Sequence, residues 1–411
     1  MIILAIETSC DETAISILDC EKNTVNVLAH EINSQIELHK EFGGVYPNLA
    51  RREHGLNCVP VLDTTLENAK LVAENFLVSE DLKTELNKML EREPTLLGLL
   101  IPFLEKTQKP KIDAIAVTEG PGLEPALWVG ITFAKALSLA WGLPIISVNH
   151  MEGHIVSALL SPVCHSREGG DPCEISIGVD SRLHGNDSVM QIQEIEFPAI
   201  SLLISGGHTE LVEIDSIGNY TVIGRTRDDA VGEAFDKVAR ILGLPYPGGP
   251  EISTLAEKAR TELLVTDYEL QVKLPRPMLH SHDLDFSFSG LKTAVLYMVQ
   301  KIPEMTEEIK IQIAKEFEDA VIEVLVSKTK TAIEKYGAKT LIVGGGVIAN
   351  KLLRETLIKS LPQTKVLIPN MKLTTDNAVM IGVAGYLKIN RPNSEYSTNL
   401  RAQGGMSLTK N

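Results

Sequence analysis

Apolar runs of strand length alternate with helix-like patterns along most of the chain. The first of these stretches, IILAIETSCDETAISILD over residues 2–19, predicts two strands joined by a polar turn at Thr8–Glu12. Residues 199–214, AISLLISGGHTELVEI, repeat the arrangement with a small-residue turn at Ser205–Gly207. Residues 339–357, KTLIVGGGVIANKLLRETL, predict a strand, a glycine-rich turn and a helix. The pattern therefore predicts an α/β protein with two similar hairpins.

Two such hairpins have a specific use when their turns present backbone N–H groups to a ligand. ATPases of the actin and sugar-kinase type hold nucleotide phosphates with paired turns of this kind. A glycine-rich turn before a helix also offers a helix N-terminus to an anion. Ordinary hairpins are the alternative, but three matching elements in one chain favour the nucleotide-binding fold.

Two regions interrupt the alternating pattern and are interpreted as insertions. Residues 74–111 combine a charged helical pattern with the apolar run TLLGLLIPFLEK and predict an extra helical hairpin on the surface. Residues 162–196 are polar, rich in Gly and Asp, and lack periodicity, which predicts a mobile surface loop. This loop contains four residues of types that can bind metals, but we do not expect a metal site there: Cys164, His165, Cys173 and His184.

The segment NHMEGHIVSALL, residues 149–160, carries a pair of histidines at helical spacing. Residues 143–148 predict a buried strand, Asn149 is a favourable N-cap, and His150 and His154 would then share one helix face. A metal site and a pair of packed histidines both fit this spacing. A zinc-peptidase interpretation is disfavoured, because Glu152 does not follow the first histidine directly and points away from it.

Composition limits the class of protein. The 411 residues include 44% hydrophobic and 23% charged residues, which fits a two-domain globular chain. No apolar run reaches membrane-spanning length and the start shows no signal peptide, so we expect a cytoplasmic protein. Five cysteines without a C-x-x-C pair indicate neither a disulfide framework nor a thiolate zinc site. The net charge of −15 argues against tight binding of nucleic acid by this chain alone.

Several motifs together resemble one enzyme family. IETSCDETAISI, GGVYPNLARREH, NHMEGHIVSALL, LISGGHTELV, DDAVGEAFDKVARILGLPYPGGP, DFSFSGLKTAV and GGGVIAN followed by TTDNAVMIGVAG occur in the order seen in the bacterial tRNA N6-adenosine threonylcarbamoyltransferase family, TsaD. The resemblance implies an actin-like fold with two lobes around a nucleotide cleft. We expect residues 1–144, completed by 382–411, to form one lobe, and residues 145–381 to form the other, carrying the metal and nucleotide sites.

The resemblance implies the reaction and its substrates. The threonylcarbamoyl group of threonylcarbamoyl-AMP would be transferred to N6 of the adenosine 3′ of the anticodon, in tRNAs that read codons starting with A, with release of AMP. Bacterial members work with two further proteins, a related TsaB-like pseudo-subunit and a small TsaE-like ATPase. These partners would supply the basic surface that a chain of net charge −15 lacks.

The resemblance also implies site residues. The metal ligands would be His150, His154 and Asp376, although Asp376 before an apolar helix also fits a simple N-cap. Two imidazoles and one carboxylate suit Fe²⁺, which the family favours, or Zn²⁺. Asp11 and Glu12 are expected to be catalytic or positioning carboxylates rather than solvated turn residues. The acyl donor would be bound by Leu203, Ile204, Ser205, Gly206, Gly207, Asp236, Gly249 and Asn350.

Three other functions remain open at this point. An actin-like ATPase or sugar kinase would use the same turns but gives no role to the two histidines. A metallopeptidase is disfavoured by the position of Glu152. A scaffold subunit without activity would not be expected to retain both histidines and Asp376.

Overall fold

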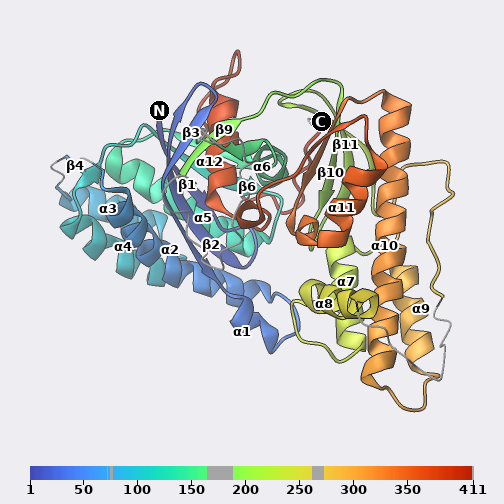
Figure 1. Ribbon diagram of the computed structural model, residues 1–411. Coiled ribbons are helices and arrows are strands. Elements are labelled where there is room, and N and C mark those ends of the chain that lie inside the picture. The colour runs from blue at the N-terminus through green and yellow to red at the C-terminus, as the bar shows by residue number, and fades with distance from the viewer. Residues whose placement is uncertain (72, 75–76, 164–187, 262–272, 410–411) are drawn as a thin grey trace, which may run out of the picture. The chain divides into compact units, whose positions relative to one another are not determined.

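The computed structural model describes residues 1–71, 73–74, 77–163, 188–261 and 273–409 (Figure 1). The chain forms two compact units. The first unit combines Met1–Gln35, Val45–Glu194 and Thr375–Ser407, and the second combines Ile36–Gly44, Ile195–Thr374 and Leu408–Asn411.

This division differs from the predicted lobe boundaries at 144 and 381. Strand β7, Ile145–Asn149, pairs in parallel with β6, Ala114–Gly120, and helix α6, His150–Ser157, packs against α12, Ala378–Ile389. These long-range contacts tie the segment with the two histidines to the first unit rather than to the second.

A seven-stranded mixed sheet forms the centre of the first unit, in the order β7-β6-β1-β2-β3-β9-β8. Strands β1 (Ile2–Glu7), β2 (Glu12–Glu21) and β3 (Thr24–Ser34) are antiparallel neighbours, and β6 runs parallel to β1. The predicted hairpin at the start of the chain is confirmed.

The second unit repeats this arrangement in a five-stranded sheet, in the order β12-β11-β10-β13-β14. Strands β10 (Ala199–Ile204), β11 (Thr209–Ser216) and β12 (Asn219–Arg225) are antiparallel neighbours, while β13 (Thr340–Gly344) and β14 (Lys365–Leu367) run parallel to β10. An antiparallel meander followed by parallel strands thus occurs once in each unit. This repetition confirms the predicted α/β class with two lobes of the actin and sugar-kinase type.

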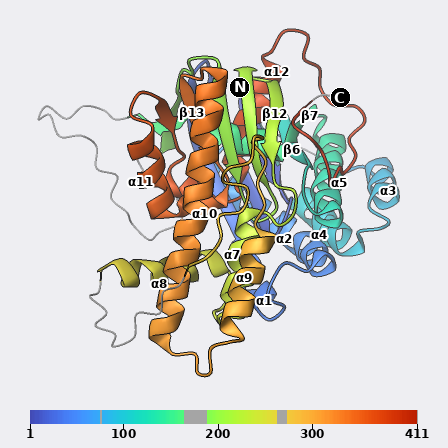
Figure 2. The ribbon, with the colours of Figure 1, turned by 90° about the vertical axis from the view of Figure 1, so that its right-hand side faces the viewer.

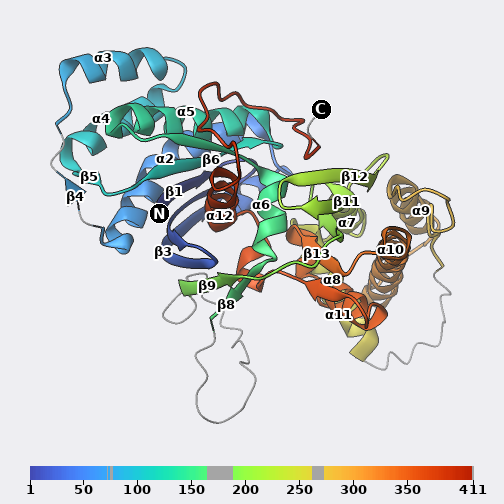
Figure 3. The same ribbon diagram turned by 90° about the horizontal axis from the view of Figure 1, so that it is seen from above.

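Helices cover both faces of the first sheet (Figure 3). Alternate strand residues such as Leu4, Ile15 and Val117 join the core beneath α2 (Pro47–Ala69), α4 (Pro94–Lys106) and α5 (Glu124–Trp141). Helix α12 packs on the opposite residues of the same strands. Gly382 lets it approach, since a Cβ there would lie 2.4 Å from Leu18 Cδ1.

The helices predicted over residues 74–111 are present, but they do not form the predicted surface hairpin. Helix α3 (Glu80–Met89) and helix α4 follow one another, with the short strands β4 (Ala73–Glu74) and β5 (Lys109–Pro110) pairing at their base. Their apolar residues, including Leu86 and Leu100, are buried in the core of the first unit. The insertion is therefore integrated into that core.

Around the second sheet lie α7 (Val231–Ile241), α8 (Gly248–Thr261), α9 (Ser289–Val299), α10 (Glu307–Tyr336) and α11 (Lys351–Ser360), as Figure 2 shows. The short helices α1 (Ile36–Lys40), η2 (Gly346–Ala349) and η3 (Met371–Leu373) complete the unit. Its core gathers Leu202, Phe235, Phe317 and Val343 from sheet and helices.

Short strands occur at both ends of the region predicted as a loop, residues 162–196. Strands β8 (Leu160–Pro162) and β9 (Val189–Ile192) pair with each other, and β9 also pairs with β3. Residues 164–187 lie outside the described residues, and with them Cys164, His165, Cys173 and His184. In the described part of the chain, every helix is too short or too polar to cross a membrane.

Candidate metal centre and nucleotide-binding residues

The junction of β7 and α6 places two histidines inside the first unit. β7 is buried along its whole length, and the Asn149 side chain caps α6 by accepting hydrogen bonds from the N–H groups of Met151 (2.9 Å) and Glu152 (3.3 Å). His150 is 6% exposed and His154 is fully buried. The predicted strand, cap and helix are therefore confirmed, with both histidines on the first two turns.

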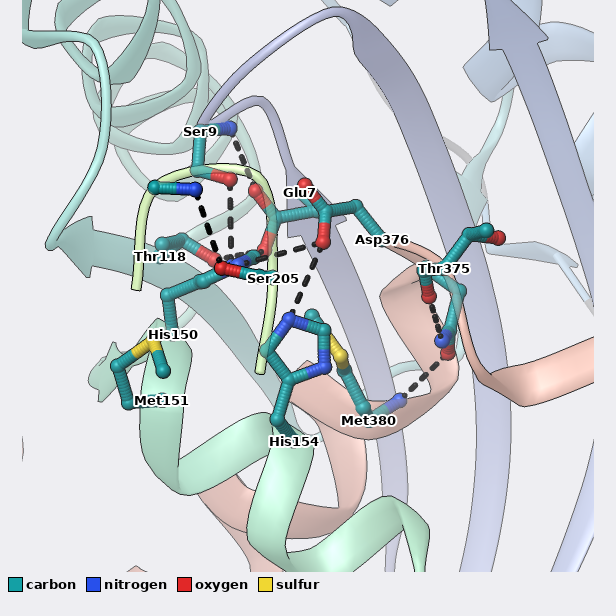
Figure 4. A network of polar contacts seen from close by, with 12 residues as sticks. Glu7, Ser9, Thr118, His150, Met151, His154, Ser205, Thr375, Asp376 and Met380 are labelled. Carbon is teal, nitrogen blue, oxygen red and sulfur yellow. Dashed lines mark hydrogen bonds and ion pairs between the residues drawn. The ribbon is translucent and has the colours of Figure 1, made fainter. Parts of the chain in front are cut away.

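Asp376 completes a compact group with the two imidazoles (Figure 4). Its Oδ1 lies 3.3 Å from His150 Nε2 and 3.2 Å from His154 Nε2. Asn377, not Asp376, caps α12 by accepting from the Met380 N–H at 2.9 Å. The capping alternative for Asp376 is thus removed, and its carboxylate is free to face the histidines.

The arrangement fits one divalent cation. Ligand atoms about 2.1 Å from a metal lie about 3.4 Å apart along a tetrahedral edge and about 3.0 Å apart along an octahedral edge. Both measured separations from Asp376 Oδ1 fall in this range. Nδ1 of the buried His154 has no hydrogen-bond partner among the described residues, and its Nε2 faces the Asp376 carboxylate. Buried polar atoms of this kind call for a ligand, so these residues could hold a metal ion.

The three groups influence one another's protonation. Burial alone raises the pKa of Asp376, but the neighbouring imidazoles outweigh it and hold that pKa well below the ordinary value. Burial lowers the pKa of His150, but the charges of Asp376 and Glu7 raise it well above the usual range. The pKa of His154 is lowered, chiefly by burial.

Two residues that the sequence analysis did not single out contact His150. Its Nδ1 lies 3.0 Å from Glu7 Oε2 and 3.2 Å from Ser9 Oγ. Glu7 is the last residue of an otherwise apolar, buried strand, and that isolated charge was the signal available in the sequence. Glu152 turns away and forms an ion pair with Arg391, which leaves it unable to serve as a peptidase base at this centre.

The predicted phosphate turn lies in the second unit, between β10 and β11. Ser205 N–H donates to His208 C=O at 2.9 Å, while Ser205 Oγ accepts from the His208 N–H at 3.1 Å. A Cβ on Gly206 or Gly207 would meet no described heavy atom within 4 Å. The turn is closed by its own hydrogen bonds and leaves room beside both glycines, whereas Leu203 and Ile204 are fully buried in β10.

Asp236, Gly249 and Asn350 have distinct positions in the same unit. Asp236 Oδ1 accepts from the Gly248 N–H at 2.7 Å, which joins α7 to the start of α8 and positions Gly249. Asn350 caps α11, since its Oδ1 accepts from the Leu353 N–H at 2.9 Å, and its amide donates to Glu318 Oε1 at 2.6 Å.

Asn350 also lines a pocket of about 230 Å³ within the second unit. The other lining residues are mostly polar: Ser253, Glu257, Arg260, Thr261, Glu318, Lys351, Leu352 and Glu355. Asn350 is the only predicted donor-binding residue among these lining residues.

Comparisons with known proteins agree with these features. The sequence model of TsaD, described as tRNA N6-adenosine threonylcarbamoyltransferase, matches residues 26–76, 103–182 and 176–383. The tRNA N6-adenosine threonylcarbamoyltransferase of Paraburkholderia xenovorans is 40% identical over 395 residues, covering 95% of this chain and 93% of that protein. The protein of the same name from Burkholderia lata is 38% identical over 413 residues, covering 98% and 97%. The chain belongs to the TsaD family.

More distant likenesses occur among solved structures. Full-length HypF in a phosphate- and nucleotide-bound form is 12% identical with a TM-score of 0.49, over 96% of this chain and 47% of that chain. The ROK hexokinase of Thermus thermophilus is 10% identical with a TM-score of 0.43, over 95% and 99%. Membership of the TsaD family therefore rests on the sequence relatives, and the fold on the strand orders described above.

In this TsaD family member, Asp11 and Glu12 lie where β1 turns into β2. Asp11 is 7% exposed. Burial, followed by the charges of Asp11 and Asp376, raises the pKa of Glu12 well above its ordinary value. Burial and the same carboxylates raise the pKa of the adjacent Cys10 thiol. The pair is therefore unlike solvated turn residues, and the surroundings of Cys10 disfavour its thiolate form.

Two basic residues, Arg51 in the GGVYPNLARREH motif and Arg276, are paired with carboxylates. Arg51 donates to Glu93 Oε1 at 2.7 Å, and Arg276 donates to Glu316 and Glu323 at 2.5 and 2.7 Å. Arg52 and Lys273 are exposed. The positive charges of Arg51 and Arg276 are thus compensated.

Proposed function

We propose that the protein transfers the threonylcarbamoyl group of threonylcarbamoyl-AMP to N6 of the adenosine 3′ of the anticodon, in tRNAs that read codons starting with A. Membership of the TsaD family supports the reaction class. The observation that carries the proposal is the convergence of the buried His150 and His154 with Asp376 in one compact group. A kinase or a scaffold subunit has no use for such a group.

The proposed reaction needs no covalent enzyme intermediate. The N6 amine attacks the carbamoyl carbon, the bond from that carbon to the phosphate oxygen breaks, and AMP leaves while the amine loses a proton. Because the mixed anhydride is already activated, no thiolate or alkoxide nucleophile is required. The raised pKa of Cys10 agrees with this, since a thiol that stays protonated is a poor nucleophile.

His150, His154 and Asp376 would hold the metal, with Fe²⁺ favoured by the ligand set and the family, and Zn²⁺ the alternative. When bound, such a cation polarises a donor oxygen as a Lewis acid. The protein's own contribution is the fixed spacing of the three ligand atoms. Two imidazoles and one carboxylate also leave coordination positions open for an oxygen ligand.

We assign donor binding to the second unit. The open space beside Gly206 and Gly207 allows backbone N–H groups to approach a phosphate, as a side chain there would not. Ser205, Asp236 and Asn350 are held by hydrogen bonds to the backbone of the same unit. Pre-formed polar groups of this kind orient a ligand without a large ordering cost.

Asp11 and Glu12 are proposed to position the attacking amine and to take up its proton. A carboxylate with a raised pKa is a stronger base than an ordinary one. Burial and the Asp11 charge create that condition at Glu12. Asp11 would then orient the amine.

tRNA binding is proposed to require partners. The net charge of −15 and the paired state of Arg51 and Arg276 leave little free positive charge for a polyanion. We propose a TsaB-like pseudo-subunit and a TsaE-like ATPase as those partners, working with this chain in the cytoplasm.

Metal content measured by mass spectrometry tests the centre. The His150→Ala, His154→Ala double variant should lose the bound metal, whereas the matched His280→Ala, His282→Ala variant changes two exposed histidines and should retain it. Equal metal content in both variants would refute the assignment.

A further inference from the structure

Glu7 is a fully buried carboxylate at the carboxyl end of β1, and three groups surround it (Figure 4). Its Oε1 accepts from the Ser9 N–H at 2.5 Å, and its Oε2 accepts from Thr118 Oγ1 at 2.7 Å. The same Oε2 lies 3.0 Å from His150 Nδ1. A buried charge is retained only when it is paired, so these contacts indicate a specific role.

We propose that Glu7 is a positioning residue that fixes the tautomer and orientation of His150 for metal binding. The inference rests on the proposed metal centre. A carboxylate can only accept at this contact, so His150 must carry its proton on Nδ1. Its Nε2 then presents a lone pair toward Asp376 Oδ1, 3.3 Å away. Metal-bound histidines commonly depend on such an outer carboxylate.

Glutamine cannot replace Glu7 in this environment. Both carboxylate oxygens face N–H donors, one from Ser9 and one from His150. An amide has one accepting oxygen and one donating NH₂ group, so it can satisfy only one of the two. If its NH₂ faces His150, it favours the tautomer with the proton on Nε2, which blocks that nitrogen as a ligand.

Charge balance supports the same role. A dication with Asp376 and neutral histidines leaves one excess positive charge in a buried site, and the negative charge of Glu7 compensates it. Glu7 therefore contributes to metal affinity through electrostatics as well as through geometry.

Metal titration of purified, chelator-stripped protein with Zn²⁺ or Fe²⁺ is the test. Glu7→Gln should lower metal affinity by about 10- to 100-fold, as is typical of outer-sphere partners. Glu119→Gln is the matched control: Glu119 is 8% exposed, lies on the neighbouring β6, and accepts from Gln403 and the Arg401 N–H rather than from a histidine. The control should retain wild-type affinity.

A second variant keeps the test decisive if Glu7→Gln fails to fold. Thr118→Val keeps the Glu7 charge and removes one of its orienting hydrogen bonds, so affinity should fall by about threefold. Unchanged affinity in every folded Glu7 and Thr118 variant would overturn the inference.

Nitrogen-15 NMR of the Zn²⁺-bound protein separates positioning from general destabilisation. The wild-type His150 ring should show the metal on Nε2 and a proton on Nδ1, and Glu7→Gln should reduce that preference without changing the signals of His54, whose Nδ1 lies 2.8 Å from Thr13 Oγ1. An unchanged His150 signature would contradict the inference. Wild-type protein that binds neither metal would instead refute the proposed metal centre itself, so the two failures are distinguishable.

Discussion

Gly345 lies in the glycine-rich turn after β13 and closely approaches the end of β10, where the other predicted nucleotide-binding turn begins. Its replacement by alanine is a sensitive test of how the two turns are packed in the second unit. It follows β13 with φ +96°, a conformation that residues with a Cβ rarely adopt. A Cβ at this position would lie 2.3 Å from the backbone oxygen of Ile204, the last residue of β10. Leu203 and Gly344 are register partners in these strands, so relief of the clash must displace the turn that begins at Ser205.

The expected magnitude follows from two contributions. Holding a residue with a Cβ in this backbone conformation costs about 1–3 kcal/mol. Forcing an extra methyl group against fixed backbone costs about another 1–3 kcal/mol. The free energy of unfolding should therefore fall by roughly 2–6 kcal/mol, which at a urea m-value of about 2 kcal/mol/M shifts the midpoint by roughly 1–3 M.

Urea titration with two probes measures this effect. Both tryptophans of the chain, Trp128 and Trp141, lie on α5 in the first unit, so their fluorescence follows that unit. Far-UV circular dichroism follows the helices of both units, including the long α10. We expect the Gly345→Ala loss to appear in the circular dichroism transition.

Gly346→Ala is the matched control. A Cβ there meets no described heavy atom within 4 Å, and the residue does not have a positive φ. Its stability should stay within about 0.5 kcal/mol of wild type. Equal midpoints for Gly345→Ala and Gly346→Ala would refute the reasoning.

Other predictions concern pH, the donor and tRNA. Burial lowers the pKa of His30 to about 4 from an ordinary 6.5. Between these two pH values the unfolded chain binds more protons than the folded chain, so the free energy of unfolding falls as pH falls. The loss should reach about 3 kcal/mol near pH 4, and a His30→Gln variant that keeps the same urea-midpoint profile between pH 4 and 7 would contradict this. Gly207→Trp should fill the open space beside the phosphate turn and abolish adenine-nucleotide binding, and unchanged calorimetric affinity would mean that the turn is not the phosphate site. The isolated chain should give little multiple-turnover transfer to tRNA until both partner proteins are added, and repeated turnover without them would refute the partner requirement. The Arg51→Glu, Arg52→Glu double variant should weaken tRNA binding by the assembled enzyme and reduce the salt dependence of that binding, while its nucleotide affinity stays constant. An unchanged tRNA affinity would show that these two residues do not belong to the tRNA interface.

Local sequence patterns predicted the elements that carry the metal ligands. An apolar run, a capping asparagine and helical spacing were sufficient to place His150 and His154 one turn apart after a strand. The two hairpins were equally readable, because alternating apolar residues around small or polar turns are a local feature.

Contacts between residues far apart in the sequence could not be predicted from such local patterns. Glu7 and His150 are 143 positions apart, and no periodicity reports that the ends of β1 and β7 present these groups to each other. The lobe boundary was misplaced for a related reason, since β7 joins the first sheet by pairing with β6 across an intervening helix. For Asp376, sequence alone allowed a cap or a ligand, and the Asn377 hydrogen bond to Met380 N–H decides against the cap.

Nucleoside analysis of tRNA tests the central claim most directly. Cells depleted of this protein should lose N6-threonylcarbamoyladenosine from tRNAs that read codons starting with A. Wild-type protein should restore the modification, and the His150→Ala, His154→Ala variant should not. Normal levels of the modified nucleoside in the depleted cells would contradict the proposed function, and full restoration by the double variant would contradict the role of the metal centre.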